Sequence, residues 1–483
     1  MRRRLSALAG LLIISRCFGK PFSRNTNTGL LTIAAILLVC LLAVPVSAVE
    51  TGSSTTRTVL PNGLVLIVKP ELGSGLVAIE AFVKAGAPQE QRARIGIGNL
   101  VARSLLGSTR NKSQQRLAAA FDEVGGTFRT DWYPDFTEVS AITTKSHFDE
   151  AVGILADVLS NAEFDPTVVS NVQDTILAEM RGENDDIGDA LYTRMLESLY
   201  KDNPYRRPKS GYSRFVRDLT RDDVMSFYKQ YYVPSNMVIS VAGDLTEEEA
   251  VERIKKAFAG TGYPVNIPQR PFADEKLDAI VTKPFERDTP VAHIMLGYLA
   301  PGVNSPDFPA FTVVNSILGG GKGSRLFTNI REKRGMGYEI GTMYPILKNQ
   351  SHLIARIVTD LYKPATPGVP REISLKEVQD AILAEVASLK EKEVSDEELL
   401  RAKRFNIGSY ALRRQRLRER SFFLGWMETI GVGYKFDYDI ASRVEAVTKA
   451  DVQRVARKYL NNYALVVAFP KNDPYIVNPF SGN

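Results

Sequence analysis

The histidine and cysteine content of the chain limits the chemistry that it could perform by itself. Its 483 residues include three histidines, His147, His293 and His352, and no two of them lie within one helical turn. Because zinc ligands cluster, each is interpreted as a lone structural histidine. The two cysteines, Cys17 and Cys40, lie near the N-terminus, so the rest of the chain has no thiol nucleophile and no thiolate ligand.

An arginine and a tyrosine in the second half have side chains that can both bind a polar group. Arg331 and Tyr338 are seven residues apart and are separated by a helix break at Gly335. A guanidinium group is permanently charged and donates hydrogen bonds as a planar fork, whereas a phenol donates one directional hydrogen bond. The alternative interpretation is a surface arginine and a half-buried core tyrosine.

The elements that must position these residues follow the same order in two halves of the chain. Apolar periodicity predicts strands grouped with helices in each half, which indicates an α+β fold of two tandem sandwich domains. In the first half, the predicted strands are 64–68, 76–83, 137–144 and 237–241, and the predicted helices are 98–106, 114–124, 148–159, 166–181, 190–200, 222–231 and 247–258. In the second half, the predicted strands are 293–298, 338–344, 353–358 and 465–469, and the predicted helices are 310–318, 325–332, 375–390, 396–424 and 450–459. One further strand is predicted at 279–282, between the two halves.

The composition of residues 259–288 is rich in glycine, proline and charge, which is typical of a linker. We therefore predict an N-terminal domain at 49–258 and a C-terminal domain at 289–483, joined by this linker. Residues 1–48 stand apart as a targeting segment.

The targeting segment begins with a basic stretch and continues with an apolar run over residues 29–44. Val46 and Ala48 fit the small-residue cleavage pattern, with a cut after Ala48. An uncleaved membrane anchor is the alternative, although a bilayer span needs roughly 20 apolar residues. Both interpretations predict an exported protein, in a bacterium a periplasmic one, which contacts the membrane only through this segment if it is not cleaved.

The charge balance gives no argument for a nucleic acid partner. Six of the 61 basic residues lie in residues 1–48, which contain no acidic residue. The remaining chain therefore carries 55 basic and 55 acidic residues, and its formal charge is neutral.

Short motifs in both halves resemble the pitrilysin/insulinase family of metallopeptidases. They occur in the family's order, and the resemblance implies two tandem homologous α/β-sandwich domains of the mitochondrial-processing-peptidase type. The motifs are Asn62-Gly63-Leu64, Asn203-Pro204-Tyr205 with Pro208, Tyr232-Val233-Pro234-Ser235-Asn236-Met237, Ala242-Gly243-Asp244, Gly319-Gly320-Gly321, Ser324-Arg325-Leu326, and Ile330 to Gly335 with Gly337-Tyr338.

The resemblance also locates a degenerate zinc motif. Active members carry His-x-x-Glu-His, in which the histidines bind zinc and the glutamate activates water, and a distant glutamate completes the ligands. Asn99 and Arg103 stand in place of the two histidines, Ala102 in place of the general base, and Glu179 at the distant ligand. The resemblance therefore implies a chain with no metal, no cofactor and no catalytic residue of its own. We expect Glu179 to pair with Arg103, because opposite charges at former ligand positions would satisfy each other.

The resemblance gives Arg331 and Tyr338 a role in substrate binding. In the family, an arginine and a tyrosine at this spacing reach from the second domain, bind the substrate backbone near the scissile bond and steady the oxyanion. Active members also have an Asn-Ala pair on the edge strand that pairs with substrate. Arg129 and Thr130 occupy that place here, so the resemblance does not carry strand pairing over to this chain.

Two functions are compatible with a chain that lacks the zinc motif and keeps the arginine–tyrosine pair. Some peptidases of the family are heterodimers in which one subunit supplies zinc and the other supplies the arginine–tyrosine pair. The main hypothesis is a non-catalytic subunit that binds peptide substrate and has a zinc-bearing paralogue as its partner. The alternative is a non-enzymatic scaffold or peptide-binding protein of the same fold. A neighbouring gene for a paralogue with an intact motif would favour the first.

Overall fold

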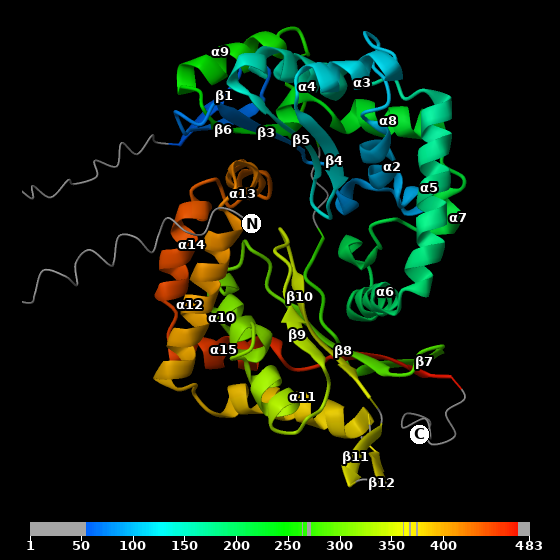
Figure 1. Ribbon diagram of the computed structural model, residues 1–483, viewed down its shortest axis with the longest axis vertical. Coiled ribbons are helices and arrows are strands. Elements are labelled where there is room, and N and C mark those ends of the chain that lie inside the picture. The colour runs from blue at the N-terminus through cyan, green and yellow to red at the C-terminus, as the bar shows by residue number, and fades with distance from the viewer. Residues whose placement is uncertain are drawn as a thin grey trace, which may run out of the picture. The chain divides into compact units, whose positions relative to one another are not determined.

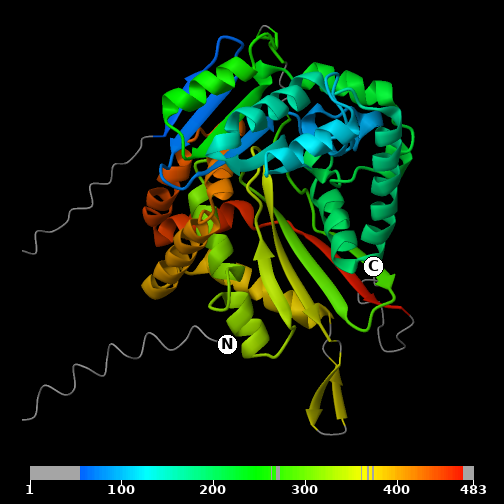
Figure 2. The ribbon, with the colours of Figure 1, turned by 45° about the horizontal axis from the view of Figure 1, so that its top comes forward.

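Each half of the chain folds around its own β-sheet, as Figure 1 and Figure 2 show. The predicted targeting segment, 1–48, lies outside the residues that the structure describes. The computed structural model describes residues 55–262, 264–267, 272–360, 362–366, 369–372 and 375–471.

The first sheet has six strands in the order β1-β2-β6-β3-β5-β4. β2 and β6 are parallel, and the other neighbours are antiparallel. β3 and β6 are buried almost throughout, which explains why they are apolar except for Glu80 and Ser240. The strands are β1 (Thr56–Val59), β2 (Val65–Pro70), β3 (Leu76–Val83), β4 (Thr127–Trp132), β5 (Thr137–Thr144) and β6 (Met237–Gly243).

The second sheet repeats this pattern. Its five strands have the order β7-β13-β8-β10-β9, with β7 and β13 parallel and the other neighbours antiparallel. This is the pairing of β2-β6-β3-β5-β4, so the predicted tandem α+β fold is confirmed. The strands are β7 (Val281–Arg287), β8 (Ala292–Ala300), β9 (Glu339–Met343), β10 (Ser351–Thr359) and β13 (Ala464–Pro470), and a separate hairpin joins β11 (Tyr362–Thr366) to β12 (Val369–Glu372).

The helices begin where the sequence supplies capping residues. Thr220, Thr246 and Thr448 each form a capping box with an acidic residue three positions later, at the start of α8, α9 and α15. In the first half the helices are α2 (Ile97–Ser104), α3 (Gln114–Glu123), α4 (Phe148–Asn161), α5 (Pro166–Asp185), α6 (Ile187–Leu199), α7 (Ser213–Val216), α8 (Arg221–Tyr231) and α9 (Glu247–Ala257). In the second half they are α10 (Phe308–Gly319), α11 (Leu375–Glu391), α12 (Asp396–Arg413), α13 (Leu417–Thr429), α14 (Phe436–Glu445) and α15 (Lys449–Tyr459), with a π-helical segment at Leu326–Glu332.

The two halves exchange helices. α6 comes from the first half but packs on β8 and β13 of the second sheet. α13 comes from the second half but packs on β3 and β6 of the first sheet. Figure 1 shows α13 against the first sheet and α6 beside the second. Each sheet is therefore covered partly by a helix from the other half.

A glycine allows close approach at each of these two contacts. A Cβ atom added to Gly425 of α13 would lie 2.2 Å from the ring of Phe82 on β3. A Cβ atom added to Gly297 of β8 would lie 2.6 Å from Met195 Sδ on α6. Separations this short are steric clashes, so any larger residue would push helix and sheet apart.

Buried charge also joins α13 to the first sheet. Arg418 contacts Glu138 of β5, and its Nε lies 3.2 Å from Glu80 Oε1 of β3. Both carboxyl side chains are almost completely buried, at 0% and 1% exposed. Burial raises the pKa of Glu80 well above its usual value, and the nearby Glu138 raises it further. The single guanidinium of Arg418 thus contacts two buried carboxyl groups, and these contacts fix the position of α13 on the first sheet.

A histidine holds the other exchanged helix. His352 of β10 lies between two tyrosine hydroxyls, with Tyr192 Oη 3.1 Å from Nε2 and Tyr200 Oη 3.0 Å from Nδ1. The ring is 1% exposed, and burial lowers the pKa of His352 to about 3. A neutral imidazole, which has one donor and one acceptor nitrogen, suits these two hydroxyls.

We expect His352 to make stability depend on pH in weakly acidic solution. Its pKa is lowered in the folded state, so its contribution is complete above the unfolded pKa of about 6.5 and is lost as pH falls toward about 3. The free energy of unfolding, measured in urea, should fall between about pH 7.5 and about pH 5 by about 2 kcal/mol more in the wild type than in His352→Asn. Equal losses in the two proteins would contradict this assignment.

The single long helix predicted at 396–424 is wrong. The chain forms two helices, α12 and α13, separated by Arg414, Gln415 and Arg416. Arg414 is held by the buried carboxylate of Asp437, and Arg420 donates to the backbone carbonyl of Gln415 at 2.7 Å. These tertiary contacts override a sequence with good helix propensity throughout.

The predicted linker contains more structure than its composition suggests. The strand predicted at 279–282 extends to Arg287 as β7 and pairs with β13. The carboxylate of Glu275 accepts backbone hydrogen bonds from Lys201, Asp202 and Asn203 at 2.6–2.8 Å. This segment is therefore tied to the first half at a defined point. The domain boundaries at 258 and 289 stay a prediction.

Candidate functional site

The helix that carries the degenerate motif, α2, is anchored at its first turn. Gly96 precedes it with φ 101°, a conformation that favours glycine, and packs against Gly211. The buried carboxylate of Glu90 accepts hydrogen bonds from the backbone amides of Gly96 and Gly98, at 3.0 and 3.1 Å. Burial raises the pKa of Glu90 to about 7, against the lowering effect of these amides and of Arg207. The amides and the acid together fix where residues 99–103 lie.

A tryptophan fills the space above one face of α2. Trp132 is 2% exposed and forms a small cluster with Ala87 and Ala102. A Cβ atom on Gly98, one turn before Ala102, would lie 2.2 Å from Trp132 Nε1. In the described part of the chain that nitrogen has no hydrogen-bond partner. Trp132 was not predicted, and the small residues Gly98 and Ala102 at a four-residue spacing are the only sequence signal for it.

The expected ion pair between Arg103 and Glu179 is present. The guanidinium binds both carboxylate oxygens, with Nη1–Oε2 at 2.5 Å and Nη2–Oε1 at 2.9 Å. The hydrogen bond from Arg103 lowers the pKa of Glu179, and the charge of Lys209 contributes. A fork-to-fork contact of this kind uses the oxygens that a metal would need.

The residues at the motif do not fit zinc. Asn99 is 4% exposed, Ala102 has no ligand atom or base, and Arg103 brings a fixed positive charge. The three histidines lie on separate elements, and among the described residues no three His, Cys, Asp or Glu side chains are placed to hold a metal ion. The site that the resemblance indicates contains an arginine–glutamate ion pair, a buried asparagine and an alanine.

Arg331 and Tyr338 lie just before β9, the strand at one edge of the second sheet. Arg331 belongs to the π-helical segment Leu326–Glu332, and its guanidinium lies 4.9 Å from the centre of the Phe327 ring. The backbone amide of Tyr338 donates to Val358 of β10 at 3.0 Å, just before β9 begins. The Tyr338 side chain is 44% exposed. Partial burial and two nearby carboxylates raise the pKa of Tyr338, so the phenol remains a donor at neutral pH.

The structure brings some of these residues together and not others. Arg103 and Glu179 are in contact, whereas among the described residues no hydrogen bond or cation–π contact joins Arg331 to Tyr338. Arg129 and Thr130 lie on β4, which is an edge of the first sheet and pairs with β5 alone among the described strands. The roles assigned to these residues by resemblance stay predictions.

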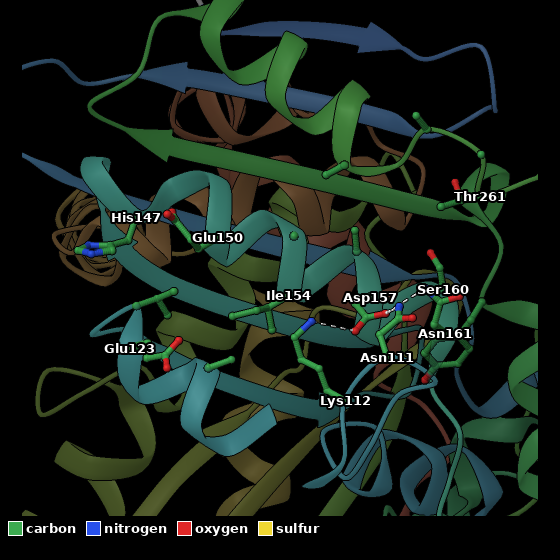
Figure 3. Close-up of a pocket in the computed structure, with 18 of the residues that line it drawn as sticks. Asn111, Lys112, Glu123, His147, Glu150, Ile154, Asp157, Ser160, Asn161 and Thr261 are labelled. Atoms are coloured by element: carbon green, nitrogen blue, oxygen red, sulfur yellow. Dashed lines mark hydrogen bonds and ion pairs between the residues drawn. The ribbon is translucent and has the colours of Figure 1, made fainter. Parts of the chain in front are cut away.

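A cavity of about 1130 Å³ lies elsewhere, against α3, α4 and the segment after α9, as Figure 3 shows. None of the candidate site residues lines it. Asp157 in its wall is already bound by Thr109, Asn111 and Asn161. Burial alone would raise the pKa of Asp157, but these hydrogen bonds outweigh it and lower the pKa. Asp157 therefore has a structural role, because it links α4 to the segment that contains Thr109 and Asn111.

Two family models match adjacent parts of this chain. The model described as "Insulinase (Peptidase family M16)" matches residues 72–211, and the model described as "Peptidase M16 inactive domain" matches residues 218–406. The chain belongs to the insulinase (M16) peptidase family. Membership accounts for the paired sheets, and the assignment of Asn99, Ala102 and Arg103 to the family's zinc motif stays a prediction.

Relatives within the M16 family cover most of the chain. An uncharacterized zinc protease of Mycobacterium leprae is 29% identical over 341 residues, which are 70% of this chain and 74% of that protein. An uncharacterized zinc protease of Bacillus subtilis is 23% identical over 420 residues, 86% of this chain and 98% of that protein. These names describe the relatives.

Solved structures show the same fold. A protease from Helicobacter pylori superposes with a TM-score of 0.79 at 20% identity and covers 86% of this chain and 100% of its own. A peptidase M16 inactive domain from Pseudomonas fluorescens has a TM-score of 0.76 at 22% identity, with coverage of 86% and 98%. At these identities the likeness concerns architecture alone.

Proposed function

We propose that this chain is the non-catalytic subunit of a heterodimeric M16 zinc peptidase. It binds peptide substrate and supplies Arg331 and Tyr338 to the active site of a zinc-bearing paralogue. The observation that carries the proposal is the contrast between the two constellations. At the motif helix, Arg103 and Glu179 neutralise each other and Trp132 packs on Ala102. By contrast, Arg331 has no ion pair among the described residues, and the Tyr338 side chain is 44% exposed.

The electrostatic surroundings of Arg331 and Tyr338 support this role. The guanidinium of Arg331 stacks on Phe327 and has no ion pair among the described residues. The raised pKa of Tyr338 keeps its phenol protonated. Groups that make few contacts within their own chain remain available to a peptide carbonyl, and preorganised donors of this kind stabilise an oxyanion.

Co-purification from the native host tests the partnership. A paralogue with an intact His-x-x-Glu-His motif should be recovered with this chain, and the pair should cleave peptides that neither subunit cleaves alone. Recovery of the chain in an assembly without such a paralogue would favour the alternative, a scaffold or peptide-binding protein of the same fold.

We also propose that the chain is exported and processed after Ala48. None of the described helices is both long and apolar enough to cross a membrane. N-terminal sequencing of the mature protein from a bacterial host should begin at Val49. A protein that keeps residue 1 and sediments with the membrane would identify residues 1–48 as an anchor.

A further inference from the structure

A basic pocket of about 370 Å³ lies in the first half, at the end of α6 and beside α7. Figure 1 labels these two helices. Four segments of the chain form it: the turn that precedes α2, the last turn of α6, the turn Pro204–Arg206 and the α7 region. The pocket shares no residue with the degenerate motif or with the Arg331 and Tyr338 pair. Its lining residues are Arg92, Ile95, Glu197, Lys201, Asp202, Arg206, Arg207, Tyr212, Arg214 and Phe215.

The charges of the lining residues do not balance, because five are basic and two are acidic. Asp202 is used by Arg92 at 3.2 Å in an exposed pair, and Glu197 accepts a hydrogen bond from Tyr212 at 3.0 Å. Among the described residues, the side chains of Lys201, Arg206 and Arg214 have no ion pair. The pocket therefore has cationic groups that no carboxylate of the chain neutralises.

The positive charges of neighbouring arginines act on Arg207. Burial lowers the pKa of Arg207, and the charges of Arg92 and Arg206 lower it further, against the opposing effect of Glu90. The carboxylate of Glu90 is the nearest acid behind the pocket, 3.9 Å from Arg207 Nη1, and it is already bound to two backbone amides. Glu275 lies on the backbone of residues 201–203, where three amides hold it. Glu90 pairs with Arg207 alone, and neither acid forms an ion pair with Lys201, Arg206 or Arg214 in the described part of the chain.

Aromatic and apolar groups form one wall. The guanidinium of Arg214 lies 4.6 Å from the centre of the Phe215 ring and 5.6 Å from that of Tyr212. Stacking of this kind holds the planar fork in place while its N–H groups remain free to bind an anion. Ile95 and Phe215 offer an apolar surface beside the charges.

We propose that this pocket binds a phosphate-class oxyanion, with Arg206 and Arg214 as its main ligands. Guanidinium groups match the oxygens of phosphate in pairs, which makes arginine the preferred residue for this chemistry. The volume exceeds what one phosphate fills, so the ligand is either free phosphate or the phosphate group of an ester whose organic part lies on the apolar wall. The site is independent of the peptidase role.

Titration calorimetry of the full chain with inorganic phosphate, at constant ionic strength, tests the proposal. We expect saturable binding that weakens at least tenfold in Arg206→Gln and in Arg214→Gln. Arg116→Gln removes one exposed arginine from α3, outside the pocket, and should bind as the wild type does. Thermal melts establish that all three variants are folded. Arg207 is unsuitable for this test because it holds the backbone carbonyl of Ala87 at 2.7 Å.

A second titration with phosphoserine distinguishes the source of the anion. Tighter binding of phosphoserine than of phosphate identifies a phosphate ester as the ligand, and equal or weaker binding identifies free phosphate. No saturable binding to the wild type would overturn the proposal. Equal weakening in all three variants would overturn it as well, because it would mean that only the net charge of the protein matters.

Discussion

Replacing Tyr338 with phenylalanine should slow peptide cleavage by a reconstituted heterodimer by about 10²–10³-fold, which is the usual cost of one lost oxyanion donor. The substitution removes a hydroxyl from a side chain that is 44% exposed, so folding should hardly change. Arg331→Lys keeps the charge but loses the planar fork, and it should also impair turnover. The measurement is cleavage of a peptide by dimers whose formation is confirmed by size.

A matched control separates this role from a general effect of a lost hydroxyl. Tyr438 is 46% exposed and lies on α14, so Tyr438→Phe makes the same change at a similar exposure. Its dimers should cleave at the wild-type rate. Normal cleavage by Tyr338→Phe dimers would refute the shared active site and favour a scaffold. Loss of dimer formation would show that the pair is structural.

Restoring the zinc motif by itself should fail to restore zinc binding. The wild-type chain should hold no stoichiometric zinc and cleave no peptide, because Asn99, Ala102 and Arg103 supply neither the ligands nor the base. The triple variant Asn99→His, Ala102→Glu, Arg103→His should also purify without zinc. A glutamate side chain at position 102 would have to enter the volume that Trp132 fills.

Adding Trp132→Thr to the triple variant should allow zinc to bind, at close to one ion per chain by metal analysis. Glu179 would then be released from Arg103 and available as a ligand. Trp132→Thr alone is the control and should bind no zinc, and thermal melts establish which variants are folded. Stoichiometric zinc in the triple variant would show that Trp132 does not block the site. A folded quadruple variant without zinc would show that the site has changed beyond these four residues.

The sequence predicted elements well where one periodicity dominated. β3 and β5 have the predicted bounds, because Leu76–Val83 is apolar except for Glu80 and Thr137–Thr144 is rich in β-branched residues. The break between α12 and α13 was not predictable, since Arg414 and Arg420 are good helix formers whose partners lie far along the chain. The short strand β1 and the hairpin β11–β12 contain too few apolar residues to be predicted. The helix α14 was missed although Phe436, Ile440 and Val444 recur at the four-residue spacing of a buried helix face.

The candidate site was predictable only where charge or resemblance pointed to it. The Arg103–Glu179 pair followed from opposite charges at related positions, and the structure contains it. Trp132 was missed because its importance depends on its approach to Gly98 and Ala102, which no local pattern records. The basic pocket was missed for the same reason, because its arginines come from separate segments.

The exchange of α6 and α13 has a consequence for the order of events during synthesis. Phe82 and Phe136 of the first half pack against Phe422 of α13, which belongs to the last part of the chain to be made. One face of the first sheet must therefore wait, with its apolar side chains uncovered, until almost the whole polypeptide has emerged. The opposite face has a core made of first-half residues alone, so the delay concerns only the face that α13 covers. Contacts between residues so far apart in the sequence slow folding. For an exported protein, that delay favours crossing the membrane before folding is complete.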